Sequence, residues 1–230
     1  MEKFLQEKYE AFKKLAAERF SYDKIDLEFI TDLVYNSLTF ERRAVTREDI
    51  KNILSGNHAK YDEKLVTTAE NHRKAFLFMV DLAKKGESLT ESKLKDCHSI
   101  LMDEHGGLYR TFNISIQGSQ HTPPPHYKIY SRMDEYFEVL KSADFPINKI
   151  AYSHLQLSKI HPFLDGNGRL ARLVLNYYML ASGLAPIIIS SADKENYFQC
   201  LEDYKVKKTT LTFINYLIQL EEASFEKYFK

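Results

Sequence analysis

Apolar residues recur at three- and four-residue spacing along most of this chain, which is the pattern of amphipathic helices. Leu27, Ile30, Leu33 and Val34, for example, share one face of a helix. Only 8 glycines and 6 prolines interrupt the 230 residues. The pattern predicts helices over residues 2–20, 24–36, from Thr46 onward, 61–85, from after Thr90 to Gly106, 130–141, 147–160, 169–182, 193–203 and 209–220.

The pattern changes between residues 109 and 125. Residues 109–116 alternate apolar and polar side chains, which predicts a short strand or hairpin. The three consecutive prolines that follow lack amide donors and predict an extended connection. We therefore expect an all-α fold with one small β-hairpin, in which residues 1–56 form an N-terminal helical region and residues 57–230 form a core domain with C-terminal helices.

The charges of the chain balance, with 32 Lys plus Arg against 32 Asp plus Glu. Zero formal net charge argues against a broad basic surface for nucleic acid or an anionic membrane, so an anion site must be local. The charged N-terminus has no signal-peptide core, and the most apolar stretch, residues 173–189, is too interrupted to span a bilayer. Cys97 and Cys200 have no metal-ligand spacing around them, and the cytoplasm is the simplest compartment.

Residues 161–172, with the sequence HPFLDGNGRLAR, depart from ordinary helix design. The proline at the second position predicts that the preceding helix ends near His161, which places this imidazole at the edge of a loop. Gly166, Asn167 and Gly168 all tolerate positive φ, so their backbone amides can turn toward one point and bind an anion. The next helix begins directly after them, and its positive end favours phosphate at the same place.

Arg169 and Arg172 lie on one face of that next helix, beside its positive end. Each cation there costs on the order of 0.3–1 kcal/mol unless something compensates it. Asp165 alone is too little to neutralise the pair, and a divalent cation on its carboxylate would add positive charge. Because local rules tend to be broken at functional sites, the cluster predicts a polyphosphate ligand.

Each of these features is weak when taken alone. A single histidine near a loop is more often packed or capping, and His72, His98 and His154 receive that interpretation. A single Gly-x-Gly is equally common in turns. The combination of imidazole, carboxylate, glycine turn and two guanidinium groups within twelve residues is what indicates a site. Phe163 and Leu164 are expected to form an apolar plug that holds the loop down.

Residues 161–172 resemble the Fic signature, His-Pro-Phe-x-Asp-Gly-Asn-Gly-Arg-x-x-Arg, at every diagnostic position. The resemblance continues in residues 107–110, GLYR, and 118–121, GSQH, which look like the flap hairpin of the family, and it covers about residues 60–205. It implies the helical Fic core as the fold. It also implies transfer of AMP from ATP to a Ser, Thr or Tyr hydroxyl of a target protein, and of the enzyme itself, as the activity.

The resemblance further implies a role for each residue of the signature. His161 takes the proton from the target hydroxyl. Asp165 holds Mg²⁺ between the α and β phosphates. The nucleotide is bound by Gly166, Asn167 and Gly168 at its α and β phosphates, by Arg169 and Arg172 at its β and γ phosphates, and by Tyr197 near its base.

The flap is expected to hold the target protein. Its residues can add a strand of the target by main-chain pairing, which positions a hydroxyl without demanding much of the target sequence. The alternative is a hairpin that only covers the core. The residues assigned to this role are Ile114, Ser115, Ile116, Gly118 and His121.

Residues 37–42, SLTFER, resemble the inhibitory motif of the family: Ser or Thr, three residues of any kind, Glu, then Gly or Asn. Their position matches the class whose inhibitory helix precedes the Fic core. Ser37 begins the motif, and the resemblance implies that Glu41 pairs bidentately with Arg172, occupying the fork that the γ phosphate needs. Arg42 departs from the expected Gly or Asn. The alternative is that Glu41 is a solvated surface carboxylate beside its basic neighbours.

Other functions stay open from the sequence. The same glutamate could align water for removal of AMP, and a nucleotide bound in reverse would transfer phosphate or phosphocholine. A noncatalytic nucleotide-sensing adaptor is disfavoured by His161, because an adaptor needs no base. A zinc hydrolase built on His154 and His161 lacks a third ligand at sensible spacing. The expected partners are ATP, Mg²⁺ and a protein target, without nucleic acid or membrane, and a homo-oligomer is left open.

Overall fold

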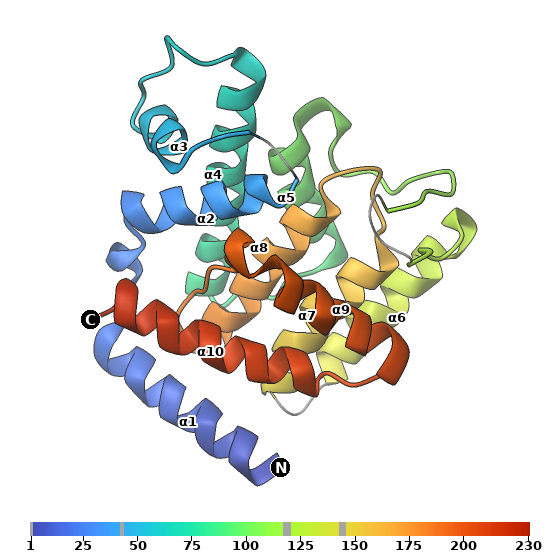
Figure 1. Cartoon of the computed structure of the whole chain (residues 1–230). Helices are drawn as coiled ribbons and strands as arrows, with labels where there is room; N and C mark the ends of the chain where they lie inside the picture. Colours follow the sequence, from blue (N-terminus) through green and yellow to red (C-terminus); the bar gives the residue numbers. More distant parts are fainter. Residues whose placement is uncertain (1, 42–43, 117–120, 143–145) are drawn as a thin grey trace.

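The computed structural model describes residues 2–41, 44–116, 121–142 and 146–230 (Figure 1). Ten α-helices and four short 3₁₀ segments occur in these described residues, and no sheet forms among them. The predicted all-α fold class is therefore confirmed. The helices are α1 (Glu2–Arg19), α2 (Leu27–Thr39), α3 (Arg47–Leu54), α4 (Glu63–Lys84), α5 (Glu91–Met102), α6 (Ile129–Ser142), α7 (Pro146–Ile160), α8 (Asn167–Ala181), α9 (Lys194–Lys207) and α10 (Leu211–Lys227).

Several helices begin at a side chain that caps their first turn. The hydroxyl of Thr46 accepts the amide of Asp49 at 3.1 Å, and the Asp49 carboxylate accepts the amide of Thr46 at 2.8 Å, so α3 begins with a reciprocal capping box. Asp62 and Thr90 cap α4 and α5 through one amide each. Gly86 follows α4 in a left-handed conformation, with φ of +67°. The predicted helix starts at Thr46 and after Thr90 are confirmed, and so is the predicted helix end near residue 85.

The last helix extends beyond its predicted end. The apolar pattern predicts a helix over 209–220, whereas α10 continues to Lys227. Ser224 and Phe225 are buried in the added turns, and Ser224 Oγ donates to Pro186 O at 2.7 Å. Contact with a segment about forty residues earlier in the chain therefore continues the helix, and local periodicity does not reveal such a contact.

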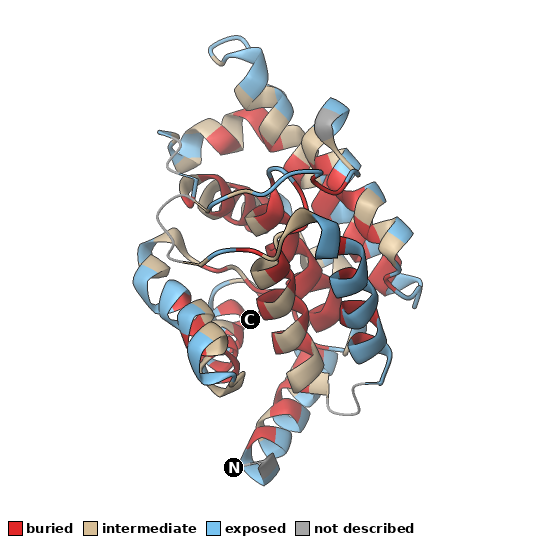
Figure 2. Cartoon of the chain, turned by 90° about the vertical axis from the view of Figure 1, so that its right-hand side faces the viewer, coloured by how far each residue is buried: buried red, intermediate tan, exposed pale blue. Residues whose placement is uncertain are grey.

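Helix α8 lies at the centre of the fold, where Figure 2 shows the buried residues gathered. It packs against α7 and α4, with further contacts to α2 and α5. Thirteen of its 15 residues are buried, so the polar side chains of Arg169, Arg172 and Asn176 are enclosed with the apolar ones. Residues 184–189 follow as a mostly buried segment outside any helix. Among the described residues, no helix is both long and apolar enough to cross a membrane.

The two N-terminal helices pack on different parts of the molecule. Helix α1 runs beside α10 (Figure 1) and also contacts α7, with Tyr9 and Phe12 buried. Helix α2 packs against α3, α4 and α8. Its residue Phe29 lies 6.0 Å from the ring of Phe76 on α4 and 5.7 Å from the ring of Phe229. The buried side chains of both helices belong to one hydrophobic core with those of α8.

The predicted β-hairpin is not confirmed. Tyr109 pairs instead with Phe163 of the loop after α7, in a single antiparallel bridge. Residues 113–116 and 121–125 form no strand within the described part of the chain, and Gly118 lies outside the described residues. The alternation around Tyr109 reflects pairing with a distant loop, which a local pattern cannot distinguish from a hairpin.

Asp32 of α2 is the centre of a buried polar cluster. Its carboxylate pairs with Arg47 of α3 and accepts hydrogen bonds from Lys227 Nζ, at 2.8 Å, and from the Tyr228 hydroxyl. Burial alone would raise the pKa of Asp32, but these hydrogen bonds lower it overall, so the carboxylate is charged at neutral pH. The cluster joins α2 to α3 and to the C-terminal end of α10.

Replacing Asp32 by Asn removes the carboxylate from Lys227 and Tyr228, whereas Arg47 keeps its ion pair with Glu28. We expect Asp32→Asn to lower the free energy of unfolding by about 1–3 kcal/mol, because hydrogen bonds to a buried charge are lost. The loss is limited because the side chains of Arg47 and Lys227 remain in contact with water. Urea unfolding followed by circular dichroism measures the change.

The matched control is Asp81→Asn. The Asp81–Lys85 pair lies on the exposed face of α4, with both side chains more than half exposed, and its loss is expected to change stability by less than about 0.5 kcal/mol. An Asp32→Asn effect no larger than that of the control would contradict the anchoring role of Asp32.

Candidate active site

His161 follows α7 and begins the loop that leads to α8. Its amide donates to Leu157 O at 3.0 Å, and its φ is +51°, a left-handed conformation that is uncommon outside glycine. Pro162 explains the change, because a proline disfavours right-handed helical geometry in the residue before it. The predicted helix end at His161 is confirmed, and the backbone is strained at this position.

The imidazole of His161 is neutral at pH 7. Burial, with a smaller contribution from the charge of Arg110, lowers its pKa to about 4, although a hydrogen bond to the Ser158 carbonyl acts to raise it. Nδ1 lies 3.4 Å from Ser158 O, which can only accept, so the proton of the neutral ring is placed on Nδ1. The lone pair is then on Nε2, where His161 can accept a proton.

The side chain of Asn167 holds the loop between α7 and α8. Its Oδ1 accepts the amide of Phe163, and its Nδ2 donates to the carbonyl of Phe163, both at 2.9 Å. Because the side chain is engaged in this way, what Asn167 offers an anion is its backbone amide at the start of α8. Phe163 is fully buried, whereas Leu164 is 57% exposed, so the expected apolar plug consists of Phe163 without Leu164.

Helix α8 begins after one left-handed residue, Gly166, with φ of +73°. The first backbone amides of a helix lack an intrahelical acceptor, and Gly166 has no side chain that could accept from those of α8. The positive φ strains any other residue at this position, and a Cβ would lie 2.6 Å from Met102 Sδ, so that the methionine side chain would have to move. Asn167 and Gly168 are already helical. The expected run of three residues in an anion-binding turn is thus corrected to a helix N-terminus preceded by one left-handed glycine.

Asp165 supplies an exposed carboxylate beside this helix end. Its Oδ1 accepts the amide of Gly166 at 2.6 Å, and its Oδ2 lies 3.7 Å from Arg169 Nη2. In the part of the chain that the structure describes, no group of three or more His, Cys, Asp or Glu could hold a metal ion. One exposed carboxylate still suits Mg²⁺, which keeps several waters and takes phosphate oxygens as its other ligands.

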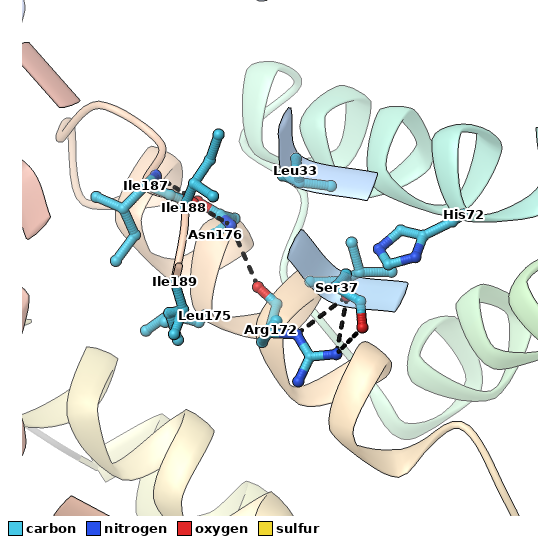
Figure 3. A pocket seen from close by; sticks show the side chains of 10 residues that line it. Leu33, Ser37, His72, Arg172, Leu175, Asn176, Ile187, Ile188 and Ile189 are labelled. Atoms are coloured by element: carbon cyan, nitrogen blue, oxygen red, sulfur yellow. Dashed lines mark hydrogen bonds between the residues drawn. The ribbon is translucent and has the colours of Figure 1, made fainter. Parts of the chain in front are cut away.

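Arg169 and Arg172 are both buried, at 2% and 8% exposure, and both contact the C-terminal end of α2. Arg172 donates to Ser37 Oγ through Nε at 3.0 Å and through Nη2 at 2.8 Å, and Nη2 also donates to Ser37 O (Figure 3). Arg169 Nε lies 2.5 Å from Glu41 Oε1, an ion pair in which the Nε–H is not aligned with the oxygen. Charges removed from water require such partners.

The expected pairing of Glu41 with Arg172 is therefore wrong, because Glu41 pairs with Arg169. Ser37 precedes Glu41 by about one helical turn, and Arg169 precedes Arg172 by about one turn. The contacts run in opposite directions along the two helices, so Ser37 takes Arg172 and Glu41 reaches Arg169. Glu41 is not a solvated surface carboxylate either, because 29% of its side chain is exposed and it pairs with a buried guanidinium.

Phe40 covers the same cluster. The guanidinium carbon of Arg172 lies 4.9 Å from the Phe40 ring centroid, and the ring of Tyr197 packs edge-on at 5.2 Å. Lys194 Nζ donates to Phe40 O at 3.1 Å, which satisfies a carbonyl at the C-terminal end of α2. Tyr197 is buried, so it forms a wall beside Arg172 under Phe40 rather than an open surface for a nucleotide base.

Of the residues predicted for the flap, the structure places His121 beside the end of α7. Ile114 and Ile116 are partly exposed and Ser115 is exposed. His121 Nε2 donates to Lys159 O at the end of α7, at 2.8 Å, which places His121 close in the structure to the loop after α7.

Two residues that the sequence did not assign to the site complete its surroundings. Lys194 holds the end of α2, and Arg110 donates from its Nε to His161 O at 3.0 Å. Neither lies in residues 161–172. The sequence around a single lysine or arginine does not reveal which distant residue it will contact. For Arg110, its position in the flap-like residues 107–110 was the one indication of a place near the site.

Comparison with known proteins identifies the family. Residues 88–179 match the sequence model of the Fic/DOC family. The chain carries a Fic domain. It is 32% identical over 155 residues to a protein adenylyltransferase Fic of Nematostella vectensis, covering 64% of this chain and 36% of that protein. It is 37% identical over 83 residues to the protein adenylyltransferase fic-1 of Caenorhabditis elegans, covering 36% of this chain and 16% of that protein. The chain thus spans about a third or less of these relatives.

Solved Fic proteins share the fold over nearly the whole chain. Fic-1 from Caenorhabditis elegans matches with a TM-score of 0.82 at 20% identity, covering 99% of this chain and 72% of that one. A Fic domain containing signaling protein from Bacteroides thetaiotaomicron matches with a TM-score of 0.81 at 23% identity, covering 97% of this chain and 94% of that one. At these identities the likeness establishes the fold, with the N-terminal helices included.

Two buried histidines of the Fic domain have tautomers set by their partners. His98 Nδ1 accepts the amide of Gly107 at 2.9 Å, so its Nε2 carries the proton and donates to Asp165 O at 3.0 Å. His154 has the opposite arrangement, because its Nδ1 donates to Ala171 O at 3.0 Å and its Nε2 accepts from a tyrosine hydroxyl. Burial lowers the pKa of both to about 4. Their packing or capping roles are as expected, and His98 also supports the loop that carries Asp165.

These two histidines make the Fic domain sensitive to acid. An unfolded histidine has a pKa near 6.5, so between about pH 6.5 and pH 4 the unfolded chain binds more protons than the folded one. The folded state therefore has its full stability above about pH 6.5 and becomes less stable as the pH decreases from 6.5 to 4. At pH 5 each buried histidine is expected to remove about 1–2 kcal/mol from the free energy of unfolding.

Urea unfolding at pH 7.5 and at pH 5.0 measures this loss in the wild type and in His154→Gln. Glutamine does not titrate, so the loss between the two pH values should be smaller in the variant, whatever its stability at pH 7.5. Equal losses in both proteins would show that His154 is not held neutral by the fold.

Proposed function

We propose that this Fic domain transfers AMP from ATP to a Ser, Thr or Tyr hydroxyl of a target protein, and of itself, and that Glu41 restrains the reaction. The observation that carries the proposal is the meeting of a neutral imidazole, His161, with two buried guanidinium groups at an uncapped helix N-terminus. The adenylyltransferase names of the relatives support the same reaction class.

The triphosphate binds where positive charge is already buried. Backbone amides at the start of α8 hold the α and β phosphates, as helix N-termini hold anions in general. Arg169 and Arg172 hold the β and γ phosphates, because their forked donors match phosphate oxygens. Tyr197 lies against Arg172 and becomes available to the base when Phe40 moves away from its ring.

His161 acts as the general base. Its Nε2 takes the proton of the target hydroxyl while the hydroxyl oxygen forms a bond to the α phosphorus. The bond from the α phosphorus to the oxygen that bridges it to the β phosphorus breaks, and pyrophosphate leaves. Because the folded pKa is about 4, the base is unprotonated at neutral pH, and this proton transfer contributes a factor of about 10² to 10⁴ to the rate.

Asp165 is the residue that would hold Mg²⁺ in this site. Its exposed carboxylate faces the start of α8, where the phosphates bind, and the amide of Gly166 orients it. When bound, the ion neutralises charge on the α and β phosphates. The carboxylate also offsets the positive charge of Arg169 when no ion is present.

The target protein docks beside residues 114–116. In the described part of the chain the backbone groups of these residues make no hydrogen bond to another backbone group. Such groups can pair with an extended segment of a target, which holds a hydroxyl near His161 mainly through main-chain contacts. His121 Nε2, bonded to Lys159 O, fixes the far end of this segment next to α7.

The C-terminal end of α2 competes with the γ phosphate. Ser37 occupies the donors of Arg172, and Glu41 neutralises Arg169, so a γ phosphate must displace them to reach either guanidinium group. Phe40 adds a steric barrier over Arg172. The nucleotide is therefore held in a nonproductive pose until this end of α2 moves away.

Labelling with ATP tests both parts of the proposal. Glu41→Gly should raise transfer of α-phosphate label to the protein by about tenfold or more, which corresponds to about 1.4 kcal/mol of relieved competition. His161→Ala should reduce the label by about 10² to 10⁴ in either background. Mass spectrometry of the labelled protein should show one adenylyl unit on a hydroxyl side chain.

Glu87→Gly is the matched control for the glutamate substitution. Glu87 also follows a helix end and pairs with a cation, Lys93, but it lies outside the site, so its loss should leave the labelling unchanged. Equal labelling of wild type and Glu41→Gly would contradict the restraint. Label that arrives from the γ phosphate of ATP instead of the α phosphate would contradict adenylyl transfer.

Substitution of Lys194 tests whether the end of α2 must move away from Arg172 before AMP is transferred. Lys194→Ala removes the cation from the Phe40 carbonyl and from the rings of Phe40 and Phe198, so α2 should release Arg172 more readily. We expect labelling about twofold to fivefold above wild type, below that of Glu41→Gly, because a partly exposed lysine contributes under about 1 kcal/mol. Lys141→Ala on the exposed face of α6 serves as the control, and equal labelling of both lysine variants would show that Lys194 does not hold α2.

A further inference from the structure

We infer that Arg110 is a positioning residue for the reaction: it holds the backbone of His161 in the left-handed conformation that presents the imidazole to the start of α8. The inference rests on the proposed role of His161 as the base. It concerns a residue outside the sequence of 161–172 that contacts this loop from a different part of the chain.

The guanidinium group of Arg110 binds three backbone carbonyls in three directions. Its Nε donates to His161 O at 3.0 Å, its Nη1 to Phe112 O at 3.0 Å and its Nη2 to Pro124 O at 2.6 Å. Its own amide donates to Pro162 O at 2.9 Å. Arg110 therefore binds two successive carbonyls of the loop after α7 and links them to the segments on either side of the flap residues.

The surroundings of Arg110 favour a role in holding backbone carbonyls. The residue is 5% exposed, and in the described part of the chain the hydrogen bonds of its guanidinium group go to carbonyl oxygens rather than to a carboxylate. Burial lowers its pKa, which shows that the environment disfavours the charge. A cation kept in such a place has a specific geometric role, since an apolar side chain would pack there without loss of hydration.

Arg110 supplies the hydrogen bonds that the described residues make to the carbonyls of His161 and Pro162. His161 has φ of +51°, and the next residue, Pro162, has no amide that could donate a hydrogen bond. The carbonyls of His161 and Pro162, which precede and follow the proline ring, are instead held by Arg110. Fixing these carbonyls fixes the direction of the His161 Cα–Cβ bond, and hence the place of the imidazole.

Lysine cannot replace this arrangement. A single ammonium group reaches one or two acceptors, whereas the planar guanidinium of Arg110 reaches carbonyls of three separate segments at once. Arg110→Lys keeps the charge and the length of the side chain and removes the three-way contact. The lysine variant thus separates an effect of geometry from an effect of charge.

The experiment compares single-turnover self-labelling of Arg110→Lys and Arg110→Gln, both made in the Glu41→Gly background. Displacement of a base by about 1 Å costs on the order of a hundredfold in rate. We therefore expect the rate at saturating ATP to fall by about tenfold or more in the lysine variant and by about a hundredfold in the glutamine variant. The ATP concentration at half-maximal rate should stay within about twofold, since Arg110 does not touch the phosphate-binding groups.

Arg132→Gln in the same background is the matched control, because it removes an arginine whose ion pair with Glu135 lies on the exposed face of α6. Its labelling should equal that of the parent protein. Rates in the Arg110 variants that equal those of this control would overturn the inference. A parallel loss of rate, of ATP affinity and of thermal stability would overturn it as well, because that result describes a general structural role.

A second readout needs no activity. The ring signals of His161 in the NMR spectrum, assigned by their absence in His161→Ala, should shift in Arg110→Lys. The pKa of the imidazole should also move toward the ordinary value for histidine, because the ring becomes more exposed. Unchanged ring signals would contradict the positioning role. If the Glu41→Gly parent transfers no AMP at all, the proposed function fails, while the NMR comparison still decides the role of Arg110.

Discussion

Arg169 and Arg172 are buried beside the N-terminal end of α8, where the helix dipole adds to their positive potential. A charge in such a place is costly unless an anion or several acceptors face it. In this structure the C-terminal end of α2 supplies them, through the hydroxyl and carbonyl of Ser37 and the carboxylate of Glu41. The same requirement would favour a polyphosphate at this place, so the proposed restraint and the proposed substrate binding depend on the same buried positive charge.

The helix that meets this demand is also part of the hydrophobic core. Phe29 packs among aromatic rings from α4 and from the C-terminal end of the chain, and Asp32 holds Arg47, Lys227 and Tyr228. These contacts lie at the N-terminal and middle turns of α2, while Phe40 and Glu41 lie at its other end. The contacts of Phe29 and Asp32 and the contacts with the two arginines therefore belong to different turns of α2.

The loop between α7 and α8 is held mainly through its backbone groups. His98 donates to the carbonyl of Asp165, Arg110 donates to the carbonyl of His161, and Asn167 binds both backbone groups of Phe163. Side chains that bind the backbone fix the course of a loop and leave its own side chains available for chemistry. This explains how a loop with one strained residue and one left-handed glycine keeps a defined shape.

The sequence alone determined the all-α fold class, most helix starts and the residues that could carry chemistry, because helical periodicity, capping side chains and the spacing of residues 161–172 are local properties. It also indicated that the end of α2 faces this cluster. Only the tertiary structure decided that Glu41 meets Arg169 while Ser37 takes Arg172, that Tyr109 pairs with Phe163 and that Arg110 reaches His161. Each of these contacts joins residues at least about 50 positions apart, and their partners depend on how whole helices cross, which no local pattern encodes.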